Sequence, residues 1–308
     1  MSSASVTGIP LALLATTAYN VGLVLEKRAL SQMQALDLRR LGRVIVSLAT
    51  SRAWLAGFAL MLTGLGCQTV VLTVEPVSVV QPVLASGVVL VLVLSRLVLR
   101  ERLRASETWG VAAIAVSLVA LALSATNTEV GRHASPSAMT AVMVPSVIVG
   151  LLAAAGPLLV HRRQPGAPMT GVWSGVGTGL LYGVAALAIK GLSGILADHR
   201  TAAGIAAGVL SSPYLYVLGG CLAVAMLLFQ AALQASRASI FVPVSAVTGS
   251  MYFIITGTWL FHERLPAGPG QLGLRVAGIA LAGLVLISLS RQAPESKPAS
   301  GDLAEVRR

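Results

Sequence analysis

The sequence predicts an all-α integral membrane protein of about nine transmembrane helices, built from two inverted four-helix repeats joined by an extra helix. Three observations predict this fold class. The chain is 56% hydrophobic and only 11% charged, which leaves too few polar residues to cover a soluble protein of 308 residues. Apolar runs close to the ~20 residues that cross a bilayer recur along the chain. The two halves of the chain also share residues at matching spacings.

The apolar runs define the predicted spans, and the polar stretches between them are too short to form a soluble domain. We therefore predict one membrane domain over residues 1–308, with a first repeat at 5–125, a connector with the extra helix at 126–170, a second repeat at 171–290 and a disordered cytoplasmic tail at 291–308. The predicted spans cover residues 6–26, 53–74, 77–98, 108–125, 139–160, 171–196, 213–235, 239–261 and 271–290.

The basic residues predict the orientation in the membrane. With nine spans and the N-terminus outside, only Arg132, Arg200 and Arg264 of the 22 Lys and Arg residues fall in outer loops, while Lys190 and Arg275 lie in or beside apolar runs. The others fall on the cytoplasmic side, as the positive-inside rule requires. We expect a multi-pass protein of the cytoplasmic (inner) membrane, with the C-terminus inside. The net charge of +11 then reports topology and argues against a nucleic-acid partner.

An internal repeat relates the two halves. Residues Tyr19 to Lys27 read YNVGLVLEK, and residues Tyr182 to Lys190 read YGVAALAIK, so that Tyr, Val and Lys recur at the same spacing. Other matches follow in the same order. They are Gly57 with Gly219, Gln68 with Gln230, Pro82 with Pro243 (one place out of register), Gly110 with Gly273, and the ERL segments at 101–103 and 263–265.

The repeat predicts a transport function. Five crossings separate each helix from its copy, and this odd number inverts the second copy in the membrane. Inverted repeats are typical of secondary transporters, in which the two halves exchange roles to open the site to either side. We therefore expect alternating-access transport of a small solute, metabolite-like or drug-like. A non-transporting membrane subunit is an alternative.

The candidate substrate residues are polar groups within apolar runs. Lys190 would anchor an anionic or zwitterionic solute, or else its long side chain reaches the headgroups. The glutamines and tyrosines would line a central cavity, or only pack and bond helices together, and Asn20 has no counterpart in the second half. The full set is Lys190, Tyr182, Tyr19, Asn20, Gln68 and Gln230.

Two further groups of residues concern the shape of the helices. Pro82 and Pro243 interrupt backbone hydrogen bonds and are candidate hinges or cavity walls, or kinks for packing. A stripe of glycines four residues apart predicts close helix packing in the span at 171–196. It consists of Gly171, Gly175, Gly179 and Gly183. Glu101 and Glu263 end their helices beside arginines and are interpreted as structural pairs at the membrane interface.

In each half a helix, a short turn, a proline-bearing helix, an ERL segment and a helix that begins with glycine follow one another. This order resembles the repeat of the drug/metabolite transporter superfamily, with EamA-type domains. Within it the chain is closest to the NIPA-type magnesium transporter branch. In the second half, residues 229–265 likewise resemble the branch, and the resemblance covers roughly residues 10–290. The first half carries the branch pattern at Trp54, Gly57, Met61, Gly64, Pro76, Pro82, ERL 101–103 and Gly110.

The resemblance implies magnesium or another divalent cation as the substrate, which is the second functional alternative. One position departs from the pattern, because Leu65 stands where the branch has an acidic residue after glycine. Magnesium prefers oxygen ligands, carboxylates above all. Because the spans contain few carboxylates and do contain lysines, the residues by themselves favour an organic solute.

No arrangement of catalytic residues or nucleotide-binding loop accompanies these features, so we expect no enzyme activity, cofactor or resident metal. The expected partners are the lipid bilayer and a small-molecule or ion substrate, and a homodimer is left open.

Overall fold

The structure is a computed structural model that describes residues 3–34, 36, 40–74, 83, 86–101, 105–124, 136–160, 168–198, 201–261 and 268–291. This part of the chain is all-helical, as predicted, and each predicted span contains or overlaps a helix. The described helices are α1 (Ser3–Gln32), α2 (Leu41–Thr50), α3 (Arg52–Val74), α5 (Gly87–Leu97), α6 (Ala105–Leu123), α7 (Pro136–Val160), α8 (Pro168–Asp198), α9 (Ala202–Ser211), α10 (Pro213–Ala235), α11 (Ala238–Leu260) and α12 (Pro269–Arg291).

Two short helices, α2 and α9, are additions to the predicted set, because ten residues are too few to form a span. Each lies between two long helices of its half. Helices α1, α2 and α3 have 30, 10 and 23 residues, and helices α8, α9 and α10 have 31, 10 and 23. The two halves therefore begin with the same order of elements at nearly the same lengths.

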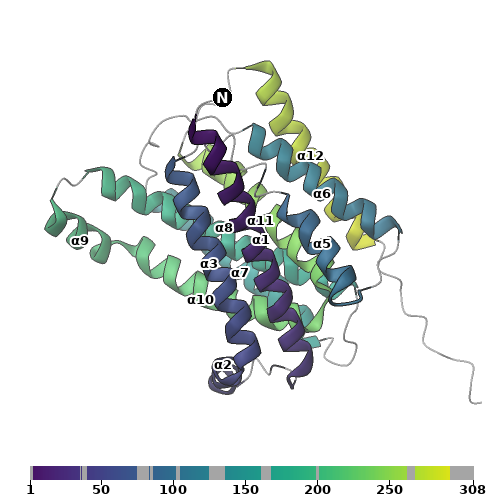
Figure 1. Cartoon of the computed structure of the whole chain (residues 1–308). Helices are drawn as coiled ribbons and strands as arrows, with labels where there is room; N and C mark the ends of the chain where they lie inside the picture. The colour runs from purple at the N-terminus through teal and green to yellow at the C-terminus, as the bar shows by residue number, and fades with distance from the viewer. Residues whose placement is uncertain are drawn as a thin grey trace, which may run out of the picture.

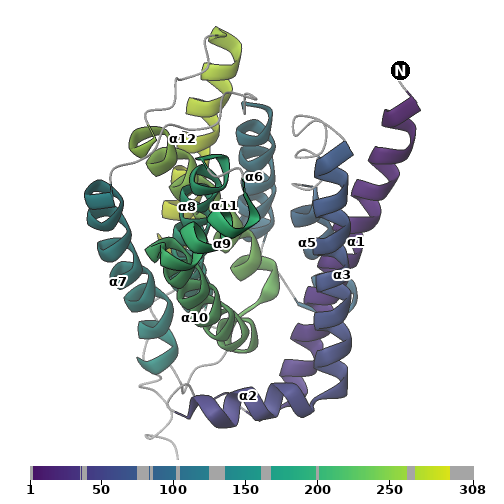
Figure 2. The same ribbon diagram turned by 90° about the vertical axis from the view of Figure 1, so that its left-hand side faces the viewer.

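The break before each 23-residue helix has the same local cause. Ser51 and Ser212 both have extended backbone angles that end the short helix. The Ser51 hydroxyl accepts a hydrogen bond from the Trp54 backbone N–H at 3.3 Å, and the Ser212 hydroxyl accepts one from the Tyr214 N–H at 3.2 Å. Serine caps of this kind satisfy N–H groups that a helix leaves unpaired at its start. At Thr50 and Arg52 the chain turns by 84°, so α2 runs across the end of α3 (Figure 2).

Five helices of the described chain are long and apolar enough to cross a membrane, and a sixth span results if α2 and the start of α3 count as one broken span. The predicted number of nine stays a prediction. Helix α1 is 30 residues long but carries Asn20, Glu26 and Lys27, and the apolar parts described for α5 and α6 are short. Large apolar side chains cover the outer surface, as expected for helices that face lipid. Leu152 and Leu284, for instance, are 68% and 66% exposed.

The helices pack as two groups (Figures 1 and 2). Helix α1 lies along α3 and also contacts α5, while α8 lies among α7, α10 and α11. Helix α12 packs on α6. Helices α1, α3 and α5 meet the other helices where α1 contacts α10 and where α5 contacts α6 and α11. Residues from α1, α2, α3, α10 and α11 contribute to one buried apolar cluster at this meeting point.

Glycines allow the closest helix contacts. A Cβ added at Gly64 of α3 would lie 2.5 Å from the Tyr19 backbone nitrogen of α1, a distance that real Cβ atoms do not show. In the predicted stripe on α8, a Cβ at Gly179 would lie 2.5 Å from the Ser245 carbonyl oxygen, and one at Gly183 would lie 2.6 Å from the Tyr252 ring. Gly171 lies against Ser236, in the link between α10 and α11, and Gly175 lies against Val244 and Phe241 of α11. The stripe is the surface through which α8 packs on α11.

Candidate functional site

A buried carboxylate lies where α1, α3 and α10 meet. The side chains of Glu26 and Gln230 are both 0% exposed. The Gln230 amide donates a hydrogen bond from Nε2 to Glu26 Oε2 at 2.6 Å, and its Oε1 accepts one from Trp54 Nε1 at 3.0 Å. We call these three residues the Glu26 cluster. The chain of bonds runs from Trp54 through Gln230 to the carboxylate, which fixes the orientation of the glutamine amide.

One oxygen of this carboxylate is left over. Glu26 Oε1 is buried and has no hydrogen-bond partner in the described part of the chain, and no described residue forms an ion pair with Glu26. A buried carboxylate oxygen without a partner is costly in an apolar environment. In a membrane-spanning bundle, an ionisable residue inside the protein is by default a candidate functional residue.

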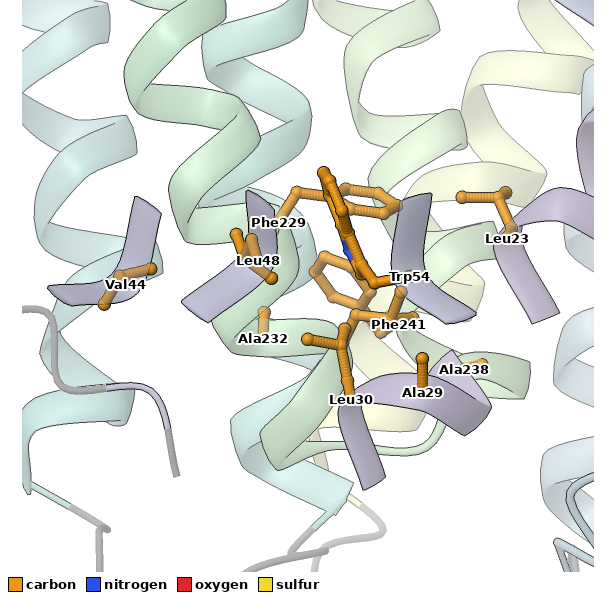
Figure 3. Packing of buried hydrophobic residues seen from close by; sticks show 11 residues of the cluster. Leu23, Ala29, Leu30, Val44, Leu48, Trp54, Phe229, Ala232, Ala238 and Phe241 are labelled. Carbon is orange, nitrogen blue, oxygen red and sulfur yellow. The ribbon is translucent and has the colours of Figure 1, made fainter. Parts of the chain in front are cut away.

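The sequence of α3 explains how this cluster forms. Trp54 and Gly57 are three residues apart and so share one face of the helix. A Cβ at Gly57 would lie 2.8 Å from the Glu26 backbone nitrogen and 3.1 Å from its Cγ, so the glycine makes room for the glutamate. Trp54 itself is 6% exposed and packs in the apolar cluster with Phe229 and Phe241 (Figure 3).

Two of the predicted tyrosines lie beside this cluster. Tyr19 is two turns before Glu26 on α1, and Tyr182 comes from α8. Both side chains pack against the apolar cluster that contains Trp54, and the Tyr182 ring meets the Phe229 ring edge-on, with centroids 6.1 Å apart. The structure thus brings together Tyr19, Tyr182 and Gln230 of the predicted set.

The other predicted residues lie elsewhere. Gln68 is half-buried on α3, 14 residues after Trp54, or about 21 Å along the helix axis. Asn20 is buried, but its Nδ2 donates to the Thr16 carbonyl of its own helix at 2.7 Å, and it packs against Gly87 of α5. Neither residue contacts the Glu26 cluster through a described hydrogen bond.

Lys190 and the two prolines complete the predicted set. Lys190 is eight residues after Tyr182, or about 12 Å along α8, and its ammonium lies over the rings of Phe261 and Phe253, at 4.6 and 5.9 Å from their centroids. Pro243 is buried inside α11. Pro82 lies outside the described residues. Whether any of these residues contacts a substrate stays a prediction.

A second polar arrangement joins the ends of α1 and α10. The Lys27 ammonium donates to the carbonyls of Leu233, Gln234 and Ser236 at 2.5, 3.3 and 2.7 Å. In return the Gln234 side chain donates to the Leu30 carbonyl at 2.9 Å, and its oxygen accepts from the backbone N–H of residue 36 at 2.8 Å. Each helix therefore satisfies carbonyls that the other leaves unpaired at its end. We call this arrangement the α1–α10 contact.

Glu101 secures the next helix. Its carboxylate follows α5 and accepts hydrogen bonds from the backbone N–H groups of Ala238 and Ser239, at 2.9 and 3.1 Å, and from the Ser239 hydroxyl at 2.6 Å. It thereby caps the N-terminus of α11, where a negative charge is favourable. The cap is a different structural role from the predicted pair of Glu101 with Arg102. That pair stays a prediction, because Arg102 and the related Glu263 lie outside the described residues.

The ligands available for a cation are limited. Within the described ranges, no three His, Cys, Asp or Glu side chains come together in a way that could hold a metal ion. Leu65, where the branch pattern has an acid, is 46% exposed on α3. Among the described carboxylates, Glu26 is the one whose side chain is fully buried.

Sequence reasoning did not place Glu26, Trp54 or Gln234 in the candidate site, and Trp54 entered only through the family pattern. The predicted first span ended at residue 26, which placed Glu26 at the membrane surface, whereas α1 continues to Gln32. A usable signal was present in the polar pair Gln230 and Gln234, one turn apart on an apolar helix, because such a pair needs polar partners on the helix it faces.

Comparison with known proteins decides the family. A family model described as "Magnesium transporter NIPA" matches residues 3–292. The chain belongs to the NIPA family of magnesium transporters. This family lies in the EamA-like drug/metabolite transporter superfamily, so both resemblances expected from the sequence are confirmed.

A curated NIPA relative supports the match. The chain is 23% identical over 302 residues to "Probable magnesium transporter NIPA9" of Arabidopsis thaliana. The aligned region covers 95% of this chain and 85% of the relative. No solved structure matches the chain. Membership in a transporter family supports a membrane-embedded transporter over an enzyme. Between the two transport functions expected from the sequence, it favours the magnesium alternative over the organic solute.

Proposed function

We propose that this NIPA-family protein carries magnesium ions across its membrane. The family match over nearly the whole chain is the observation that carries the proposal. The structure removes part of the argument for an anionic solute, because the Lys27 charge is taken up by backbone carbonyls. It also supplies a buried carboxylate that the sequence placed at the surface. A negative group inside the bundle suits a cation.

Alternating access is the proposed mode of transport. The matching order α1–α2–α3 and α8–α9–α10 supports two copies of one unit, and their inversion follows from the predicted topology. The α1–α10 contact and the Glu101 cap join the two halves at one end. In the repeat α8 corresponds to α1 and α3 corresponds to α10, so α3 and α8 are the matching pair of helices. In the described part of the chain these two helices do not pack on each other as α1 and α10 do. The structure then corresponds to a state closed at the α1–α10 end, which is the cytoplasmic end in the predicted topology.

Magnesium flux into proteoliposomes tests the proposal. The purified protein is reconstituted with a magnesium indicator inside the vesicles, and empty vesicles and vesicles with heat-denatured protein serve as controls. We expect uptake that saturates with external magnesium. Absence of uptake from protein that elutes as a folded species would overturn the magnesium function and leave an organic solute as the substrate.

A further inference from the structure

The Glu26 cluster has an unmet requirement. One carboxylate oxygen takes the Gln230 amide, and the other is buried with no partner among the described residues. Lys27 follows directly in the sequence, but neighbours on a helix point about 100° apart, and its ammonium bonds to the end of α10. The positive charge adjacent in the sequence is therefore not available to balance an ionised Glu26. A cation at Oε1 would balance it.

The surroundings of Oε1 suit one kind of cation. Magnesium is commonly held by one or two carboxylates and keeps several of its water molecules, whereas calcium needs six to eight oxygen ligands. The Glu26 cluster offers a single carboxylate. Tyr19 and Tyr182 pack against the apolar cluster that contains Trp54, and a phenol oxygen is able to accept a hydrogen bond from bound water. Such a site would hold a partly hydrated magnesium ion.

We propose that Glu26 Oε1 binds the transported magnesium ion, an inference that rests on the magnesium transport proposed above. Gln230 positions the carboxylate, and Trp54 fixes the amide of Gln230 in the orientation that donates to Glu26. These two are positioning residues.

The same helical turns link this site to the closed end. Glu26 directly precedes Lys27 on α1, and Gln230 is one turn before Gln234 on α10. The pair that holds the ion and the pair that forms the α1–α10 contact therefore come from the same two segments. Separation of α1 from α10 would break both pairs, so release of the ion and opening of this end are a single movement.

Magnesium binding by the full-length protein in detergent tests the site. The probe is magnesium chloride added to metal-free protein, and the readouts are the shift in the thermal unfolding midpoint and titration calorimetry, with flux measured in parallel. The decisive variant is Glu26→Gln, which keeps the size of the side chain and removes its charge. Glu107→Gln, which changes another carboxylate of the chain in α6, is the matched control.

We expect wild type and Glu107→Gln to be stabilised by magnesium to the same extent. Glu26→Gln should be at least as stable as wild type without magnesium, because an unbalanced buried charge is gone. It should need at least about tenfold more magnesium for half-maximal stabilisation, since one charged ligand is lost, and should lose most of its flux. If the glutamine variant does not fold, Glu26→Asp replaces it and should show weaker binding, because its carboxylate is one methylene shorter.

The outcomes separate this inference from the proposed function. Magnesium flux in wild type with unchanged magnesium binding in the Glu26→Gln or Glu26→Asp variant would overturn the site and leave magnesium transport standing. Loss of flux in Glu26→Gln with unchanged magnesium binding would also overturn it, because the carboxylate would then act at another step. Folded wild-type protein with neither flux nor magnesium binding would overturn the proposed function itself.

Discussion

Lys27 and Lys190 have the same sequence context and different surroundings. Each follows a tyrosine by eight residues, Tyr19 in one case and Tyr182 in the other. Lys27 reaches out of its own half and donates to carbonyls at the end of α10. Lys190 lies over the rings of Phe253 and Phe261, in α11 and just after it, within its own half. A shared sequence pattern thus does not fix a shared contact.

The difference indicates what holds the two halves together. The α1–α10 contact and the Glu101 cap consist of charged groups bonded to helix ends, and hydrogen bonds of this kind contribute more to stability than neutral ones. The cation–π contact of Lys190 ties α8 to α11, which already pack through the glycine stripe. If the halves exchange roles during transport, polar bonds are the ones that must break and re-form. Substitution of each lysine therefore tests whether the contacts between the halves are stronger than the contact within one half.

Replacement of Lys27 should have the largest effect. In Lys27→Met the carbonyls at the end of α10 lose a charged donor, and the unfolding free energy should fall by about 2–4 kcal/mol. The measurement is unfolding in detergent, followed by tryptophan fluorescence. Arg28→Met is the matched control, because Arg28 is the adjacent basic residue and is exposed. It should change the unfolding free energy by less than about 0.5 kcal/mol. Equal effects of the two variants would mean that the α1–α10 contact contributes nothing beyond net charge.

Replacement of Glu101 should have an intermediate effect. Glu101→Gln removes the negative charge from the N-terminus of α11 and leaves one oxygen to accept hydrogen bonds, so the loss should be about 1–2 kcal/mol. Ser239→Ala, which removes the hydroxyl bond and keeps the two backbone bonds, should lose less. Unfolding under the same conditions as for Lys27 gives the comparison. A larger loss in Ser239→Ala than in Glu101→Gln would show that the hydroxyl, and not the charge, anchors this helix.

The sequence predicted those parts of the fold that depend on local pattern. Apolar runs located the long helices, and the four-residue spacing of glycines located the face of α8 that packs on α11. The short helices were missed for a physical reason. Helix α2 is too short to span a membrane and contains Arg43, so its composition predicts a loop. It forms a helix because Val44 and Leu48 pack into a core contributed by distant helices.

The site could be predicted only in part, because its contacts are long-range. Gln230 was found through its match with Gln68, yet the partner that gives Gln230 its role is Glu26, 204 residues away in the chain. Gln68 itself lies about 21 Å along α3 from Trp54, which donates to Gln230. The repeat therefore marked polar positions without revealing which of them meet. The packing of α1 on α3, which Gly57 permits, and the contact of α1 with α10 decide that.

Replacement of Lys190 should have the smallest effect and completes the comparison. A cation over aromatic rings contributes about 0.5–1 kcal/mol where the site is open to solvent and about 2 kcal/mol where it is not. Lys190→Met should therefore lower the unfolding free energy by less than Lys27→Met does. Lys190→Arg should retain most of the stability, because a guanidinium also interacts with aromatic faces. Lys27→Arg should retain less, because a bulkier planar group has to fit among the carbonyls that end α10. The measurement is the stability that arginine retains at each position. If arginine were tolerated equally at both, the two lysines would serve as positive charges alone. The difference in their surroundings would then have no energetic consequence.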